Sequence, residues 1–394
     1  GGKTVRGISI SGNAVVENLT VQNCDSSSKV QGVGVAISSG ILRNCRVTNC
    51  SNGAHDSTGI GVYLSGTALV TGCIIENCTS SKRATGYGAY LAEKGTTLER
   101  TLVTGCTNER STTTNQGAVY VKAGVVRSCT IAGNKLVSYS GLYLADTADA
   151  KAYDTIVWGN EDWDDGSSLA PDLCVGAKAV VECICAPVAA PNDPSPITDN
   201  PLFVDAANGD FSLRPSSPCI EHQVGAIPYD TTKPAFGLAA TKRQGVNELE
   251  TTLSVVGFGG AEATAVAWTV DGVEAGSDAE LVKTFGPGFH TVSAAVTGAG
   301  GPVTVTEDEF IKVYASEVFV DAQSSNPVAP YTTAETAAKK FDDAYPFLAT
   351  NGTMRIAAGT YTFTKEYYVR TPQKFLGENR ETTILKPLSQ YRHF

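Results

Sequence analysis

The side chains that could carry out acid–base chemistry are spread thinly along this chain. Cleaving a glycosidic bond takes two carboxyl groups held several ångströms apart. The charged positions that recur at a regular interval form one outward column, in which no two carboxylates follow each other: Glu17, Arg43, Thr71, Glu99, Arg127 and Tyr153. The four histidines fall in separate segments, at His55, His222, His290 and His393. We therefore expect no enzymatic activity, and we interpret His55-Asp56 as a solvated turn rather than a catalytic pair.

Metal and cofactor chemistry is also weakly represented. The densest acidic cluster is Glu161-Asp-Trp-Asp164-Asp165-Gly. Oxygen-rich loops can hold calcium, but this one has no recognisable ligand spacing, so a solvated loop is the preferred interpretation and calcium the open alternative. Cys183 and Cys185 lack the second pair or nearby histidine that a zinc site needs. We expect no cofactor.

Four tyrosines form a regular column, each between two apolar residues that point inward: Tyr63, Tyr90, Tyr120 and Tyr143. Stacked outward tyrosines can offer sugar rings an apolar surface with a polar edge. They can equally be covered by loops or stabilise the neighbouring strands. These four residues are the candidates for contact with a glycan.

A sequence repeat carries these residues. Six similar segments follow one another in steps of 26 or 28 residues, ending at Cys24, Cys50, Cys78, Cys106, Asn134 and Asn160. Such a period indicates supersecondary units that bury their apolar faces only by stacking on each other. A further run rich in β-branched residues precedes each segment, as in GVGVAI and GIGVYL. The alternation predicts a coil of short strands that lie parallel from rung to rung, not strands and helices.

Two further columns of residues predict where the coil bends and which side chains lie inside it. One column admits only asparagine and glycine, which predicts a bend with positive φ in every rung: Asn23, Asn49, Asn77, Gly105, Gly133 and Gly159. Most of the eleven cysteines also recur in columns, including Cys45 with Cys73 and Cys50 with Cys78. We interpret them as buried, stacked small apolar residues, with disulfides between rungs as the alternative.

The repeat resembles the right-handed parallel β-helix of the pectate-lyase-like superfamily. The asparagine column is similar to the stacked asparagines of its turns. Residues 200–205 (NPLFVD), 209–213 (GDFSL) and 217–219 (SPC) resemble the closing motif of many secreted β-helix repeat proteins. The resemblance implies an all-β fold with a β-helix over residues 1–228. Enzymes of this superfamily place acidic calcium ligands and an arginine or lysine base on one outward face, a pattern that we do not find here.

Composition limits the partners and the compartment. The 394 residues carry a formal net charge of −10, and only 18% of them are charged. Because no basic cluster is present, we expect no nucleic acid as a partner. We expect no insertion into a membrane, since no run of 18 apolar residues occurs. A Gly-, Thr- and Val-rich chain with few lysines suits an extracellular or cell-surface scaffold, and the start within a repeat predicts a removed upstream segment.

The repeat stops near Pro234, and two further domains are predicted. Residues 229–315 read as short alternating strands with one buried tryptophan, Trp268, and a hairpin turn at Asp271-Gly272. They look like a PKD or other Ig-like β-sandwich. Residues 316–394 begin with a capping box at Thr332–Glu335 and an amphipathic helix that places Ala337, Phe341, Ala344 and Leu348 on one face. This domain resembles the cap and initial rungs of a β-helix.

The two ends together suggest an assembly. The chain opens within a rung and closes with a cap, so it reads as a circular permutation of an ordinary β-helix unit followed by an Ig-like module. An uncapped rung exposes unpaired backbone groups. We expect the C-terminal cap of one copy to complete the N-terminal rungs of another copy, either as a non-covalent polymer or within a covalent tandem repeat. The candidate contact residues are Phe341, Leu348, Tyr367, Leu376, Ile384, Val5, Ile8 and Ile10.

Three functions follow from these observations. The leading hypothesis is a non-catalytic structural module of an extracellular fibre or surface adhesin, joined head to tail with other copies of itself. The alternatives are a polysaccharide lyase or hydrolase, suggested by the fold alone, and a glycan-binding β-helix that uses the tyrosine column.

Overall fold

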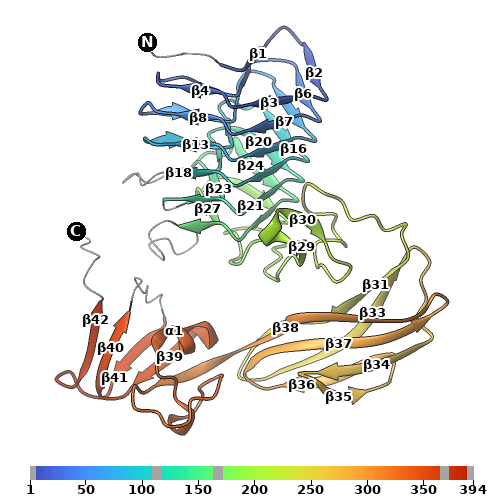
Figure 1. The fold of residues 1–394 in the computed structure, drawn as a ribbon, viewed down its shortest axis with the longest axis vertical. Helices are drawn as coiled ribbons and strands as arrows, with labels where there is room; N and C mark the ends of the chain where they lie inside the picture. The colour runs from blue at the N-terminus through green and yellow to red at the C-terminus, as the bar shows by residue number, and fades with distance from the viewer. Residues whose placement is uncertain (1–5, 109–116, 138, 163–171, 364–371, 388–394) are drawn as a thin grey trace. The chain divides into compact units, whose positions relative to one another are not determined.

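The computed structural model describes residues 6–108, 117–137, 139–162, 172–363 and 372–387. Within it the chain divides into two compact units, residues 1–229 and residues 230–394. Both units are built almost entirely of β-strands (Figure 1). No helix in the described ranges is long and apolar enough to cross a membrane.

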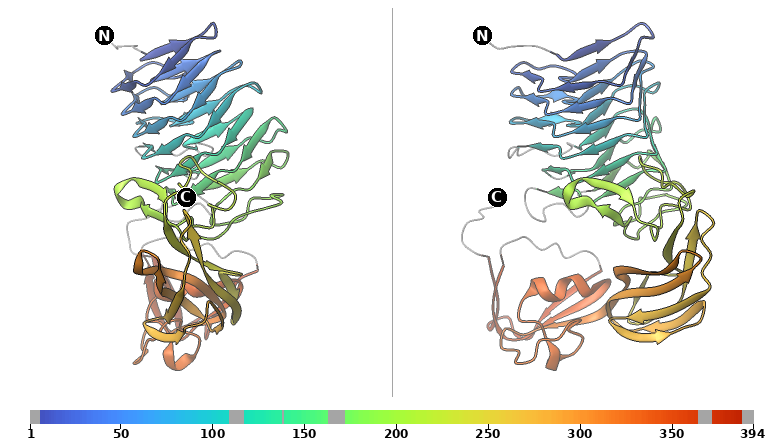
Figure 2. Two further views of the ribbon diagram at one scale, coloured as in Figure 1. Left: turned by 90° about the vertical axis from the view of Figure 1, so that its right-hand side faces the viewer. Right: turned by 45° about the vertical axis from the view of Figure 1, so that its right-hand side comes forward.

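The first unit is a solenoid of four parallel sheets, in which each rung except the last contributes one short strand to each sheet (Figure 2). The first sheet contains, in spatial order, β1 (Ile8–Ile10), β5 (Val35–Ile37), β10 (Val62–Leu64), β15 (Ala89–Leu91), β19 (Val119–Val121), β23 (Leu142–Leu144) and β27 (Leu173–Val175). The second contains β2 (Val15–Glu17), β6 (Ile41–Arg43), β11 (Leu69–Thr71), β16 (Thr97–Glu99), β20 (Gly124–Arg127), β24 (Ala150–Tyr153) and β28 (Val180–Glu182). The third contains β3 (Thr20–Gln22), β7 (Arg46–Thr48), β12 (Ile74–Glu76), β17 (Leu102–Thr104), β21 (Thr130–Ala132) and β25 (Ile156–Trp158). The fourth contains β4 (Asp25–Ser26), β8 (Ser51–Asn52), β13 (Thr79–Ser80), β18 (Thr107–Asn108), β22 (Lys135–Leu136) and β26 (Glu161–Asp162), and a minor pair is formed by β9 (Ser57–Thr58) and β14 (Ala84–Thr85).

The register places like residues above one another. Leu42, Val70 and Leu98 pair across β6, β11 and β16, and all three are completely buried. The same holds for Val47 and Ile75 in the third sheet. Since burial of an apolar side chain contributes about 1.5–3 kcal/mol, these repeated columns provide the main stabilisation of the solenoid.

The rungs enter the left-handed region of backbone conformation in several recurring columns, two of which flank the strands of the third sheet. The predicted bend is confirmed, because every member of the asparagine and glycine column has a positive φ, from 53° at Asn49 to 68° at Gly159. The column that begins at Asn18 also has positive φ, which the sequence interpretation did not foresee. This second bend includes Arg100, with φ of 44°, and Ser128, with φ of 48°.

A closing segment follows the last rung. It contains an antiparallel pair, β29 (Phe203–Asp205) and β30 (Asp210–Leu213), linked by η1 (Ala206–Asn208). Phe203 and Phe211 pack edge to face with ring centroids 5.2 Å apart. They share an apolar cluster with Ile156 of β25. The segment that resembles a closing motif therefore packs on the side of its own solenoid.

The second unit begins with a module of two sheets. One sheet contains β31 (Ala235–Ala240), β33 (Leu249–Phe258) and β36 (Glu280–Phe285). The other contains β35 (Val273–Gly276), β34 (Ala265–Val270), β37 (Gly288–Gly298), β38 (Gly301–Val320), β39 (Leu348–Ile356) and β41 (Lys374–Gly377), with β32 (Gln244–Val246) also beside β38. Trp268 lies in the core between the two sheets and is 1% exposed. Asp271 and Gly272 both have positive φ and form the turn between β34 and β35.

The C-terminal part of this unit changes from antiparallel to parallel pairing. β38 pairs antiparallel with β37 along its first part and parallel with β39 at its end, and β39 pairs parallel with β41. A second parallel pair is formed by β40 (Gly359–Phe363) and β42 (Thr383–Pro387). The strands thus begin a second parallel ladder.

The sequence predicted one amphipathic helix over residues 332–348, and the prediction of a continuous helix is wrong. The structure contains instead η2 (Ala334–Thr336), α1 (Phe341–Ala344) and η3 (Tyr345–Phe347), and Leu348 already belongs to β39. The helix breaks because Ala338 pairs with the end of β38, donating to the Phe319 carbonyl and accepting from the Asp321 N–H. The cap residue is Thr333, whose hydroxyl accepts from the Thr336 N–H, not Thr332.

Candidate functional site: the outward columns of the solenoid

The tyrosine column forms a continuous stack of rings on the first sheet. Tyr63, Tyr90, Tyr120 and Tyr143 stand in register on β10, β15, β19 and β23. Successive ring centroids are 5.5, 5.2 and 4.8 Å apart, with interplanar angles of 9°, 2° and 5°. Each side chain is half-buried, and its neighbours in the strand are completely buried, as predicted for outward positions.

This stacking decides which part of each ring is accessible. Inner members of the column have both ring faces covered by other tyrosines, so a sugar could reach only ring edges and hydroxyl groups. Tyr139 packs against Tyr143 edge to face at 5.6 Å, and Gln31 donates to the Tyr63 hydroxyl at 3.1 Å. Burial, with the neighbouring phenols, raises the pKa of Tyr90 to about 12. The geometry favours rung-to-rung stabilisation over a flat sugar-binding platform.

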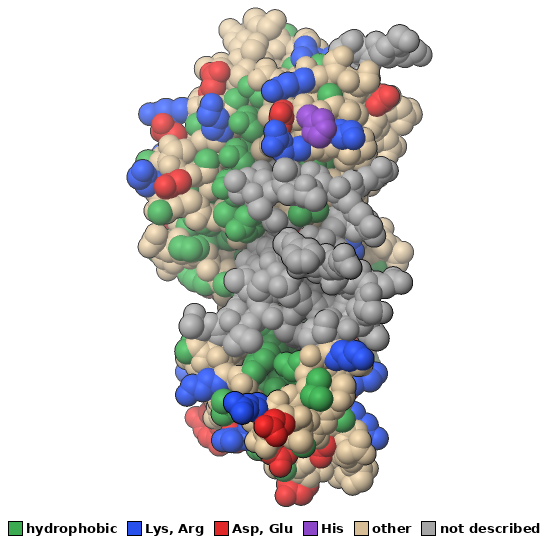
Figure 3. Space-filling model, turned by 90° about the vertical axis from the view of Figure 1, so that its left-hand side faces the viewer, with side chains coloured by type: hydrophobic (Ala, Val, Ile, Leu, Met, Phe, Trp, Pro, Cys, Tyr) green, Lys and Arg blue, Asp and Glu red, His purple; other side chains and the backbone are tan. Residues whose placement is uncertain are grey.

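The charged columns pair opposite charges between rungs. Arg43 bonds Glu17, and Arg127 bonds Glu99 with an N–O distance of 2.6 Å. On the third sheet Arg46 bonds Glu76 at 2.6 Å. In Figure 3, hydrophobic side chains follow successive rungs as a narrow band with charged side chains beside it.

Glu99 illustrates the electrostatic result of this pairing. Burial acts to raise the pKa of its carboxyl group, but hydrogen bonds from Arg127 and Thr71 and the charge of Arg127 lower the pKa overall. A general acid needs a raised pKa. This carboxylate is therefore suited to an ion pair rather than to proton donation.

The remaining candidates do not come together. His55 is exposed, and the adjacent Asp56 bonds Arg83 on the next rung. His290 bonds Asp271 at a hairpin turn of the second unit, and His393 lies outside the described residues. In the acidic cluster, Glu161 bonds Lys135 at 2.9 Å, whereas residues 163–165 also lie outside the described ranges. Within those ranges, no three metal-ligating side chains are grouped to hold a metal ion.

A buried polar ladder continues the cysteine column at the end of the solenoid. The Asn134 amide donates to Asn160 Oδ1 at 2.8 Å, and the Asn160 amide donates to Asp172 Oδ1 at 2.7 Å. Asp172 is 7% exposed. Burial raises its pKa to about 6, although its hydrogen bonds from Asn160 favour the ionised form. The sequence interpretation missed Asp172 because the residue lies outside the repeated pattern.

Comparison with known proteins agrees with this architecture. Residues 6–162 match the family model described as right handed beta helix region. These rungs form a right-handed parallel β-helix. No curated protein and no solved structure matches the chain.

The assembly candidates at the start of the β-helix lie on its first described rung. Ile10 is 3% exposed, and Ile8 is half-buried, with both side chains in the inward columns of the first sheet. Val5 lies outside the described residues. On the same rung, Val15 and Leu19 are 52% and 38% exposed. These two exposed side chains were not among the candidates.

The assembly candidates of the second unit divide into two groups. Phe341 and Leu348 are 5% and 6% exposed and belong to the unit's own core, so they present no free surface. Leu376 and Ile384 are 45% and 47% exposed on β41 and β42, and Tyr367 lies outside the described residues. The register adds Leu385, which pairs with the buried Tyr361 and is nevertheless 45% exposed. Strand alternation along β42 would have found this inward position.

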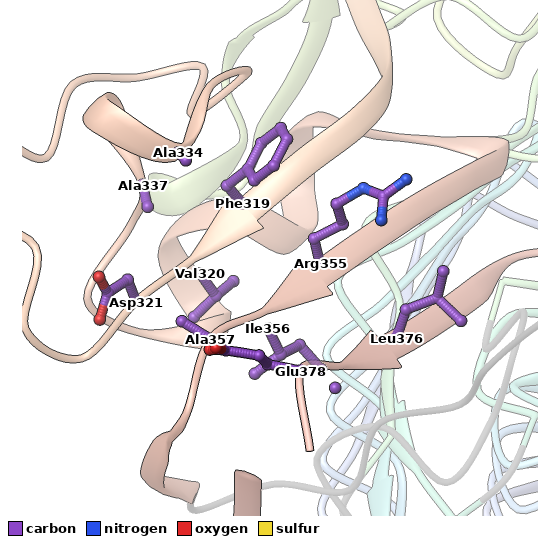
Figure 4. A pocket seen from close by; sticks show the side chains of 11 residues that line it. Phe319, Val320, Asp321, Ala334, Ala337, Arg355, Ile356, Ala357, Leu376 and Glu378 are labelled. Carbon is purple, nitrogen blue, oxygen red and sulfur yellow. The ribbon is translucent and has the colours of Figure 1, made fainter.

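A groove of about 540 Å³ lies over the parallel strands β38, β39 and β41 (Figure 4). Phe319, Arg355 and Leu376 stand in register across it. Its charged groups already make interactions: Arg355 bonds Glu317 at 2.5 Å, Glu378 accepts from the Ala358 N–H at 2.9 Å, and Asp321 accepts from the Gln323 N–H at 2.8 Å. The groove thus offers mainly apolar contact, with two carboxylates that accept backbone N–H groups at its edge.

Proposed function

We propose that this protein is a non-catalytic structural module of an extracellular fibre or surface adhesin. The observation that carries the proposal is that the side chains of the outward columns interact with the equivalent side chains of the adjacent rungs. Tyrosine rings stack on tyrosine rings, and the glutamates bond arginines of the adjacent rung. Such columns support a stiff rod, whereas catalysis of glycoside cleavage would need free carboxyl groups.

The joining of units is the second part of the proposal. Among the described strands, β41 pairs with β39 alone and β42 pairs with β40 alone, so each has an edge that can accept a further parallel strand. Leu385 pairs with the buried Tyr361, so its side chain extends an inward-facing column to that edge. At the other end, β1 and β2 pair only with β5 and β6. We infer that the edge of β41 and β42 in one copy meets the first rung of the next copy, which would extend both ladders.

The two-sheet module would act as a spacer in such an array. Its buried Trp268 and the turn at Asp271-Gly272 support an Ig-like or PKD assignment. The bend column likewise supports placing the β-helix in the pectate-lyase-like superfamily. Modules of this kind separate or present other domains, which fits a repeating extracellular fibre.

Assembly can be tested on the purified chain. We expect sedimentation velocity to show concentration-dependent growth and negative-stain electron microscopy to show filaments with a regular axial repeat. Leu385→Asp should abolish growth, because it places a charge on the inward column at the joining edge. The matched control is Val273→Asp, which alters a residue of the same unit that is 68% exposed on β35. A chain that stays monomeric at high concentration would contradict head-to-tail joining.

Glycan binding is the second candidate, and the row of phenol edges favours it. The tyrosines from Tyr63 to Tyr143 are half-buried and stand at the spacing of the rungs. A glycan array followed by calorimetry would test this function. Binding that is lost in Tyr90→Phe would support contact through the hydroxyl groups, and cleavage of a polyuronide would favour the enzymatic alternative instead.

A further inference from the structure

Three cysteines of the first unit belong to the apolar cluster that the closing segment forms with the rungs. All eleven cysteines are free thiols in the structure. Cys183 and Cys185 follow β28, whereas Cys219 comes from the closing segment, and the three share one apolar cluster. Cys185 and Cys219 are both completely buried, and burial together with the neighbouring Cys219 thiol raises the pKa of Cys185.

Cysteines of successive rungs, such as Cys50 and Cys78, also lie close enough to affect each other's pKa, but the backbone places them differently. Cys50 and Cys78 occupy equivalent positions on successive parallel rungs, so their Cα and Cβ separations both follow the rung spacing of about 4.7–4.9 Å. A disulfide usually needs Cβ atoms about 3.5–4.5 Å apart. Stacked cysteines are therefore poorly placed for bonding. Cys219 is not held by this spacing, because its segment approaches the rung from outside the ladder.

We propose that Cys185 and Cys219 form a disulfide when the chain folds in an oxidising compartment. The oxidant is a disulfide of a folding catalyst or of oxidised glutathione. One thiolate attacks that disulfide, which releases the first thiol of the oxidant and leaves a mixed disulfide. The other thiolate then attacks the protein sulfur of the mixed disulfide and releases the second thiol. The new S–S bond forms as the oxidant's bond is broken, the two cysteines lose two electrons and two protons, and the oxidant leaves as two thiols.

This bond would fasten the closing segment to the β-helix. It encloses residues 186–218, which include the paired strands β29 and β30. Their aromatic residues cover Ile156 in the last rungs. Oxidation must occur before this cover closes, since both thiols are buried in the folded unit. The inference does not depend on the proposed role in a fibre, because it concerns folding of a single unit.

The test compares the whole chain exported to a bacterial periplasm with the same chain made in a reducing cytoplasm. Free thiols are alkylated under denaturing conditions. Trypsin, which cleaves after Lys178, and an Asp-specific protease, which cleaves before Asp193 and Asp210, then separate Cys183 and Cys185 from Cys174 and Cys219. Mass spectrometry should find one cross-linked peptide in the exported chain, with fragment ions that place the bond at Cys185. Eleven alkylated thiols, or a bond among the rung cysteines, would overturn the proposal.

Variants separate the two possible partners of Cys219. Cys183→Ala should retain the cross-link, and Cys185→Ala should lose it. A cross-link that survives in Cys185→Ala but not in Cys183→Ala would also overturn the assignment. In the wild-type chain, reduction should lower the melting temperature of the first unit by about 5 °C. Cys219→Ala should show no difference between oxidised and reduced samples, and Cys129→Ala serves as the rung control that keeps the difference.

Discussion

Replacing Asp172 by asparagine should stabilise the protein above about pH 6. In the structure, Asp172 Oδ1 accepts from the N–H and the side-chain amide of Asn160, at 2.8 and 2.7 Å. Asn134 and Asn160 show that asparagine fits this ladder, since Asn160 Oδ1 accepts the same pair of bonds from Asn134. An asparagine at position 172 can keep both bonds without placing a charge in a buried site.

The size of the effect follows from the pKa of Asp172. Burial raises this pKa from 3.8 to about 6, so the folded state disfavours the ionised form. Stability from this group is fully present below pH 3.8 and falls as the pH rises from about 4 to about 6, after which it stays constant. The pKa difference corresponds to about 3 kcal/mol. At pH 7.5 the Asp172→Asn variant should therefore unfold with a free energy larger by about 2–3 kcal/mol, and at pH 4 the two proteins should differ little.

Urea denaturation at several pH values between 4 and 8 measures this difference. Carboxylates in ion pairs, such as Glu99, change stability in the opposite direction, but their effect cancels when the variant is subtracted from the wild type. Asp278→Asn removes one negative charge from an exposed position and controls for net charge. A difference that does not change with pH, or a variant less stable than wild type at pH 7.5, would refute the reasoning.

Three further substitutions test the columns of the β-helix. Tyr90→Ala should lower the free energy of unfolding by about 1–3 kcal/mol, because two ring contacts are lost, and Tyr90→Phe should change it little in the same urea titration; equal losses would show that the hydroxyl group matters more than stacking. Gly105→Ala should cost more than about 1 kcal/mol, since φ is +64° and the added Cβ would lie 2.3 Å from Asn77 Oδ1. Its control is Gly159→Asn, which has φ of +68° and no atom within 4 Å of the new Cβ, and should be tolerated. Leu98→Ala should cost about 2–5 kcal/mol through loss of burial and a cavity, and a loss below about 1 kcal/mol would contradict its place in the core.

The repeated part of the fold could be predicted because six segments show the same pattern of apolar, asparagine and glycine positions. Val70 and Ile75 were placed inward from one alternating pattern, and both are completely buried. The bend at Asn77 followed from a column in which every residue tolerates positive φ. The second bend was missed because its residues are not specialised. Arg100 and Ser128 enter the left-handed region where their N–H groups donate to Arg127 and Tyr153 carbonyls of the next rung.

Elements that occur once in the chain were harder to predict. The helical spacing of Phe341 and Ala344 correctly indicated two buried residues, but it could not reveal that Ala338 leaves the helix to pair with β38. Edge pairing is a tertiary interaction, and here it overrides a local propensity. Asp172 likewise has a raised pKa because it is buried in the folded unit, although its hydrogen bonds from Asn160 lower the pKa, and local sequence does not show this burial.

The structure of a β-helix also explains why its outward columns contain few unpaired charged groups that could act in catalysis. Equivalent residues of adjacent rungs lie about 4.7–4.9 Å apart, so identical charges would stand directly beside one another, and like charges in such positions are destabilising. The column that begins Glu17–Arg43 and continues through Thr71 to Glu99–Arg127 avoids this repulsion by alternating charge with its opposite or with a neutral residue. An active site with two adjacent carboxylates has to depart from that order and accept the repulsion. In the described rungs of this column, the order is kept, which is the physical reason to look for function in the stability and joining of rungs.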